Sequence, residues 1–332
     1  MATTQHIRSS AAAVLLVAAS LLAAHVEPAS AQPGSTCGGT STLLAADTSA
    51  ALSVTQTYGR THAVRAAYSW PVKPFDRQHP VRANLNDPRI GHEGGESFHF
   101  GIDISVPDGT PVYAVTGGKA YVRPGNVSVA DGGTHSFGYW HVRAAVVNHQ
   151  PVRRHQLLGW VIAGWEHVHF AERANGVYLN PLRPGGLGPY ADSSAPTIGE
   201  ITLTHRAGGV VQVLANAYDT PSPRVPGHWT NEPVSPALLQ WRISHNGRAI
   251  GGWQTAADFR TRMLDRKLFE SVYAPPTRQN HKGNAGLYCF FLSHAWKPAD
   301  GTYRIEVAAS DTRENRAVAH LDFTVEHGLV LS

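Results

Sequence analysis

An all-β fold is what this sequence of 332 residues predicts. The chain holds 32 Gly and 22 Pro, which interrupt helices and support tight turns. Its apolar residues form short runs that are bounded by Gly, Pro or Asp, as in β-strands. Hydrophobic residues at 42% and charged residues at 16% are an ordinary globular balance, so disorder is not expected.

The N-terminus (1–31) has the form of a secretory signal peptide. His6 and Arg8 precede an apolar run over 11–24, and the small residues 29–31 offer a cleavage site. An uncleaved anchor helix is the alternative, but the run is short for a bilayer. No later stretch of about eighteen residues is apolar throughout. We therefore expect an exported protein with no stable membrane insertion after signal cleavage.

The charge limits the kinds of partner that we expect, and the cysteine content bears on a possible disulfide. The 28 Lys and Arg exceed the 24 Asp and Glu by four, and the basic residues are scattered, so no nucleic-acid partner is expected. Cys37 and Cys289 are the only cysteines. Export permits a disulfide between them. Separate thiols are the alternative, and the spacing does not decide between the two.

Two folded domains are expected after a flexible segment over 32–65, which is rich in Ser, Thr, Gly and Ala. The first domain covers 66–190. Short β-like runs at 111–115 and 119–122 favour an antiparallel sheet there. The Gly- and Pro-rich stretch 183–196 marks the end of this domain.

The second domain covers 193–332 and is predicted to be a β-sandwich of immunoglobulin or fibronectin type. The antibody arrangement of Cys and Trp is absent from it. This domain is interpreted as a spacer beside the first domain or as a binding module. Its expected strands are 198–204, 210–218, 238–243, 303–309 and 317–325.

Three places among the 19 histidines carry possible chemistry. The first is His99 and Asp103, four residues apart around Gly101. On a straight strand their side chains would lie about 13 Å apart, too far to share one metal ion. Gly101 can supply the bend that brings them together.

The other two places are the pair His167 and His169 and the lone His141. The pair points to one face of a strand because side chains alternate. Alone, His141 is better interpreted as a strand histidine that bonds a backbone carbonyl. Two neutral imidazoles and a carboxylate suit Zn²⁺ and leave a fourth position for water, whose pKa falls to about 7. Remaining histidines could act as general base or oxyanion donor.

The order of these motifs resembles that of the lysostaphin and LytM-type zinc endopeptidases, which cut peptide cross-links in bacterial peptidoglycan. The resemblance spans roughly 68–182. It consists of a His-x-x-x-Asp box at 99–103, a later His after an aromatic at 139–141, and a His-x-His-Phe box at 167–170. Flanking similarity lies in Trp70-Pro71-Val72, Gly109-Thr110-Pro111-Val112, Gln156-Leu157-Leu158-Gly159 and Asn180-Pro181-Leu182.

The resemblance implies ligands for one Zn²⁺ per chain and two catalytic histidines. The implied ligands are His99, Asp103 and His169, and the implied catalytic residues are His141 and His167. The implied fold is a folded antiparallel β-sheet with the zinc at the floor of a groove. The implied substrates are peptidoglycan peptides.

The predicted function is therefore that of a secreted or wall-associated zinc metalloendopeptidase that hydrolyses peptide bonds of peptidoglycan through a zinc-activated water. A catalytically silent wall-binding or regulatory protein is one alternative, and a zinc peptidase acting on secreted proteins is another. Two stretches depart from the family. Residues 85–89 keep an Arg at the position where the family often has one, but the beginning of this stretch differs. Residues 162–166 are bulkier and more charged than the usual Gly-rich approach to the His-x-His box, which predicts a narrower groove or a different selected side chain.

Overall fold

The computed structural model confirms the all-β prediction. It describes residues 36–37, 55–57, 66–91, 95–220, 222–229 and 232–331, and the expected signal peptide lies outside these residues. Thr36–Ser332 forms one compact unit. Its described part contains antiparallel sheets, one α-helix, α1 (Phe269–Val272), and two short 3₁₀ turns, η1 (Gly227–Trp229) and η2 (Arg266–Leu268). None of the helices in the described part is long and apolar enough to cross a bilayer.

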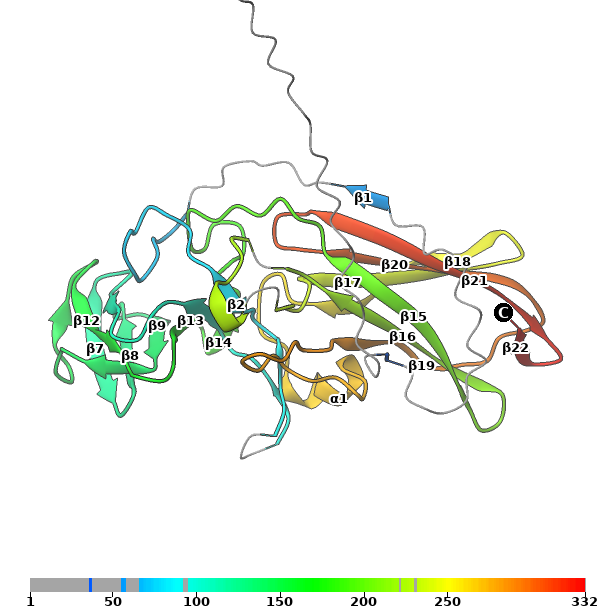
Figure 1. Cartoon of the computed structure of the whole chain (residues 1–332), viewed down its shortest axis with the longest axis horizontal. Coiled ribbons are helices and arrows are strands. Elements are labelled where there is room, and N and C mark those ends of the chain that lie inside the picture. Colours follow the sequence, from blue (N-terminus) through cyan, green and yellow to red (C-terminus); the bar gives the residue numbers. More distant parts are fainter. Residues whose placement is uncertain are drawn as a thin grey trace, which may run out of the picture. The chain divides into compact units, whose positions relative to one another are not determined.

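The N-terminal half of this unit (66–190) is built on an eight-stranded antiparallel sheet, here called the large sheet (Figure 1). Its strand order is β11-β7-β8-β9-β13-β5-β2, and β14 pairs with β13. The strand bounds are β2 (Val81–Ala83), β5 (Ile102–Ser105), β7 (Gly118–Arg123), β8 (Asn126–Ala130), β9 (His135–Trp140), β11 (Pro151–Val152), β13 (His167–Ala174) and β14 (Val177–Leu179).

One face of the large sheet packs into an apolar core with a three-stranded sheet, β10-β12-β6. Ile104 and Phe170 enter this core from the large sheet, and Val112 and Leu158 enter it from the smaller one. All four are fully buried. The remaining strands of this half are β3 (Pro88–Arg89), β4 (Ser97–Phe98), β6 (Pro111–Tyr113), β10 (Val142–Ala144) and β12 (Leu157–Val161).

The C-terminal half (193–331) contains two further sheets around a second core. Val213 and Phe290 enter that core from the sheet β15-β16-β19, and Trp241 and Ile305 enter it from the sheet β1-β21-β20-β17-β18, where β22 pairs with β21. The bounds are β1 (Thr55–Thr57), β15 (Thr197–Arg206), β16 (Val210–Tyr218), β17 (Leu238–His245), β18 (Arg248–Asp258), β19 (Cys289–Trp296), β20 (Gly301–Ser310), β21 (Arg316–Glu326) and β22 (Leu329–Leu331).

Each strand expected in this half has a counterpart there. Its immunoglobulin type and the boundary between the two domains stay predictions. Two described pieces of the segment expected to be flexible contact the C-terminal half. Residues 55–57 pair with β21, and Cys37 forms a disulfide with Cys289 across a sequence separation of 252.

Candidate metal centre

The large sheet brings the predicted His and Asp motifs together. Strands β5 and β13 are neighbours, and their register places Asp103 directly opposite His169. Because side chains alternate along β13, His167 and His169 share one face, while Val168 and Phe170 are buried in the core on the other. The metal-binding candidates therefore occupy the face of the large sheet that does not form the core.

His99 reaches the same place because the chain bends at Gly101, between β4 and β5. A Cβ atom at position 101 would lie 2.4 Å from the backbone oxygen of Phe170 and 2.9 Å from Nε2 of His169. Glycine is thus required here by the close approach of β13. The predicted bend is confirmed, since His99 Nε2 lies 3.2 Å from Asp103 Oδ1.

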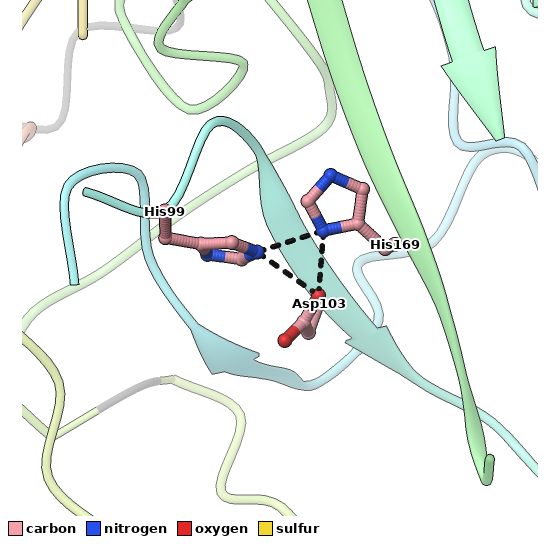
Figure 2. A group of neighbouring side chains, drawn as sticks. All are labelled: His99, Asp103 and His169. Atoms are coloured by element: carbon pink, nitrogen blue, oxygen red, sulfur yellow. Dashed lines mark hydrogen bonds and ion pairs between the residues drawn. The ribbon is translucent and has the colours of Figure 1, made fainter. Parts of the chain in front are cut away.

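Figure 2 shows the three side chains converging on one point. Nε2 of His99 lies 2.7 Å from Nδ1 of His169, and the latter atom lies 3.0 Å from Oδ1 of Asp103. Around a tetrahedral zinc ion with bonds of about 2.1 Å, neighbouring ligand atoms lie about 3.4 Å apart. The observed triangle is slightly tighter than this. The three atoms are close enough to hold one small metal ion.

Outer hydrogen bonds orient two of the three candidate ligands. The carbonyl of Asn84 lies 2.8 Å from His99 Nδ1, so that nitrogen donates to it and Nε2 keeps its lone pair. Arg89 Nη2 donates to Asp103 Oδ2 at 3.1 Å, which leaves Oδ1 for a metal. Nε2 of His169 is buried and has no hydrogen-bond partner among the described residues. A proton on one ring nitrogen, or a metal ion between the three atoms, would make these close approaches favourable.

The local environment supports the protonation states that metal ligands require. Burial, assisted by the Arg89 guanidinium, lowers the pKa of His99 to about 3, so its imidazole is neutral near pH 7. Burial alone would raise the pKa of Asp103, but the neighbouring His99 and His167 and a hydrogen bond from His169 hold it well below its usual range. The group thus combines neutral imidazole with an ionised carboxylate.

The two predicted catalytic histidines lie beside this group. His167 Nε2 is 3.5 Å from Asp103 Oδ1, and its Nδ1 is 2.6 Å from the Trp165 carbonyl and 2.5 Å from Arg82 Nη2. The ring centroids of His141 and His167 are 4.6 Å apart. Burial lowers the pKa of both rings, to about 3 for His141. All five predicted site residues are therefore close together.

His141 differs from the expectation of a strand histidine that bonds a backbone carbonyl. Strand β9 ends at Trp140, and His141 has a φ of 63°, a left-handed conformation that interrupts the strand. Its ring stacks on Trp165, with centroids 3.5 Å apart and an interplanar angle of 14°. The bulky approach noted in the sequence thus holds His141 at the edge of the site.

The candidate ligands line a cavity of about 590 Å³, here called the metal cavity. Its walls include side chains of both halves, among them Trp165 from the N-terminal half and Trp229 and His281 from the C-terminal half. Glu166 forms an ion pair with Lys282 across the two halves at 3.0 Å. The C-terminal half therefore contributes to the site as well as to the fold.

Sequence reasoning missed Arg82, Trp229 and Lys282. The guanidinium of Arg82 lies 4.1 Å from the Trp229 ring centroid, and its buried Nη1 has no hydrogen-bond partner among the described residues. These residues are far apart in the chain and form no spaced motif. No signal in the single sequence could have identified them.

A second cluster of possible ligands lies outside the metal cavity. Asp192, Asp219 and Asp311 are all buried, and one oxygen of each lies within 4.8 Å of the others. Burial raises the pKa of Asp219 well above its usual range, and the two neighbouring carboxylates raise it further. We call this cluster the acidic group.

Neither a protein-family model nor a curated protein sequence matches the chain. Among solved structures, it is similar to the catalytic domain of the antimicrobial peptidase lysostaphin from Staphylococcus simulans, with 23% identity over 30% of this chain and 86% of that one and a TM-score of 0.27. A zinc-containing peptidase from Vibrio cholerae is 23% identical over 39% of this chain and 41% of that one, with a TM-score of 0.31.

A structure described as an M23 peptidase from Pseudomonas aeruginosa is 22% identical over 37% of this chain, with a TM-score of 0.26. The matched part spans about half of that structure, 51% of its length. All three TM-scores are at or below 0.31.

Proposed function

We propose that this chain is a secreted zinc metalloendopeptidase that hydrolyses peptide bonds of bacterial peptidoglycan. The observation that carries the proposal is the convergence of His99, Asp103 and His169 in a cavity that also contains His141 and His167. Three protein ligands with an open fourth position are typical of catalytic zinc sites, whereas structural sites have four. The order of the motifs supports a wall peptide as the substrate.

The residues around the site can divide the chemistry between them. Zinc would make a water molecule nucleophilic near neutral pH and polarise the scissile carbonyl. Nδ1 of His167 lies beside both the Trp165 carbonyl, which accepts, and Arg82 Nη2, which donates, so its tautomer follows from which of the two it bonds. In the tautomer that donates to the carbonyl, Nε2 keeps a lone pair close to Asp103. That nitrogen can accept a proton from the attacking water and deliver it to the leaving amine. His141, held by stacking on Trp165, can donate a hydrogen bond to the developing oxyanion.

The walls of the metal cavity provide hydrogen-bonding groups for a substrate. Arg82 is 8% exposed and has a donor, Nη1, without a partner among the described residues. A buried donor of this kind costs about 1–3 kcal/mol when unsatisfied. A substrate carbonyl in the cavity would satisfy it. The volume of about 590 Å³ is within the usual range for ligand sites.

Secretion is supported by two features of the chain. Residues 1–31 have the composition of a signal peptide. The disulfide between Cys37 and Cys289 is of the kind that persists in oxidising compartments outside the cytosol. Both features agree with a substrate outside the cell membrane.

The proposal is tested by incubating purified peptidoglycan with the zinc-loaded mature protein and identifying the fragments by mass spectrometry. We expect new amino termini that disappear when a chelator is added and return with zinc. The His141→Ala variant is the matched control, because it keeps the three candidate ligands and loses a histidine beside them.

Two other outcomes would redirect the proposal. Cleavage of casein with intact peptidoglycan would favour a peptidase that acts on secreted proteins. A zinc-loaded protein that cuts neither substrate would favour the catalytically silent wall-binding or regulatory protein.

A further inference from the structure

A second hollow of about 660 Å³ lies on the same face of the large sheet as the candidate ligands. We call it the sheet hollow. Trp140 lines both the sheet hollow and the metal cavity, so the two are adjacent. Its other aromatic lining residues are Tyr121, whose side chain is exposed, and Tyr178. The peptidase activity proposed above does not involve the sheet hollow.

The strand register defines the relation between the two sites. One cross-strand row runs from His169 on β13 through Trp140 on β9 and Asn126 on β8 to Arg123 on β7. The next row on this face consists of Ala171, Gly138, Ser128 and Tyr121. Three of these four residues are small. The ring of Trp140 lies over Gly138 and forms one wall of the hollow. Arg123 thus stands at the far side of a hollow that starts at Trp140.

The charge of the sheet hollow is positive. Its lining includes Arg123 and Arg173 and contains no Asp or Glu. Neither arginine forms an ion pair with any residue that the structure describes, although Arg173 lies over the ring of Tyr178 at 5.8 Å. Both side chains are exposed. Two unpaired guanidinium groups and no carboxylate make a site suited to a carboxylate ligand, since arginine binds carboxylates through charge-assisted hydrogen bonds.

We infer that the sheet hollow binds an acidic side chain of the peptide that is cut in the metal cavity. This inference rests on the proposed function. Three strand spacings separate β13 from β7, a distance of about 14 Å. An extended peptide advances about 3.5 Å per residue. The acidic residue that reaches Arg123 therefore lies about four positions from the scissile bond.

The activity test uses matched peptides that carry Glu or Gln at each position from two to six residues on either side of the cleaved bond. For the zinc-loaded protein, we expect kcat/KM to be about tenfold higher with Glu than with Gln near the fourth position on one side, chiefly through KM. Arg123→Gln and Arg173→Gln should each reduce this ratio towards one. Arg154→Gln, an exposed arginine of the same half outside the hollow, should leave it unchanged.

A binding test separates this inference from the proposed function. The affinity of the metal-free protein for the Glu and Gln peptides is measured by titration calorimetry, where no turnover is needed. If the protein binds the Glu peptide more tightly and Arg123→Gln removes this preference, the inference is supported even when no peptide is cut. Cleavage with equal kcat/KM for the Glu and Gln peptides at every position would overturn the inference, whereas the proposed peptidase activity would still hold. Equal binding of both peptides, with tighter binding of a peptide-free glycan strand, would also overturn it.

Discussion

The candidate metal centre and the acidic group both bring three buried ligand-bearing side chains together, but their electrostatics are opposite. In the metal centre, His99, Asp103 and His169 supply two imidazoles and one carboxylate. In the acidic group, three carboxylates face one another. Burial and the negative charges of Asp192 and Asp311 raise the pKa of Asp219. The same degree of burial therefore accompanies a lowered pKa at Asp103 and a raised pKa at Asp219.

The difference shows that the neighbours of a buried carboxylate decide its charge. Asp103 has an arginine on its outer oxygen and imidazoles on its inner one. Asp311 instead accepts hydrogen bonds from the Asn315 side chain and from backbone N–H groups, which do not carry a full positive charge. A carboxylate of the first kind stays ionised and can bind a metal, whereas one of the second kind keeps its proton to a higher pH than usual.

The largest expected effect is the loss of zinc from the metal centre when its carboxylate is removed. Asp103→Ala leaves two imidazoles for the ion, so we expect zinc affinity to fall by more than about 100-fold. Asp219→Asn changes the acidic group and should keep one zinc per chain. Metal analysis after dialysis measures both. Full zinc content in Asp103→Ala, or loss of zinc in Asp219→Asn, would contradict the assignment of the metal to the metal centre.

Removing a histidine beside the metal should affect turnover and leave binding unchanged. His141→Ala keeps all three candidate ligands, so zinc content should match that of the unaltered protein. We expect peptide hydrolysis to fall by about 10²- to 10⁴-fold, the usual contribution of a positioned acid–base or oxyanion group. Fragment release measured by mass spectrometry tests this. Unchanged turnover would show that His141 has no catalytic part.

A side chain at the bend should disturb the metal centre and spare the acidic group. In Gly101→Ala, the new Cβ would lie 2.4 Å from the Phe170 oxygen, so β5 and β13 must separate. We expect weaker zinc binding and a loss of about 1–3 kcal/mol in the free energy of unfolding. Gly252→Ala is the control, because a Cβ there has open space around it. Equal zinc affinity and stability in the two variants would contradict the need for glycine at the bend.

The smallest expected effect is a pH dependence that comes from the acidic group. Burial, with the charge of Asp192, raises the pKa of Asp311 to about 6, above its value in the unfolded chain. The folded protein then holds protons that the unfolded chain has released, so this contribution to stability falls as the pH rises from about 4 through about 6. The pKa of Asp219 is raised in the same direction, so Asp219 also contributes to this fall. Asp219→Asn removes its contribution and should reduce the fall by about 1–2 kcal/mol.

Urea unfolding at pH 4.5 and pH 7.5 measures this difference in metal-free protein. Asp76→Asn is a suitable control, because its side chain is exposed and lies outside the acidic group. A fall in stability that is equal in Asp219→Asn and the unaltered chain would show that the acidic group does not titrate as proposed.

Much of the fold follows from local patterns in the sequence. The alternation around His167 and His169 is sufficient to place both side chains on one face of a strand, and the close approach that requires Gly101 is marked by the residue itself. The conformation of His141 was not predictable in this way. Its φ of 63° depends on the turn between β9 and β10 and on the Trp165 ring that covers it.

The sequence by itself predicted the strand content, because the alternation of apolar residues is a local property of the chain. The five candidate site residues came from the spacing of three His motifs together with the resemblance to the lysostaphin and LytM-type endopeptidases. Only the tertiary structure decided which strands are neighbours. The pairing of β5 with β13 places Asp103 opposite His169, and the chain fold brings Trp229 and Lys282 to the same cavity. Such contacts depend on packing between segments more than 60 residues apart, for which a single sequence contains no direct signal.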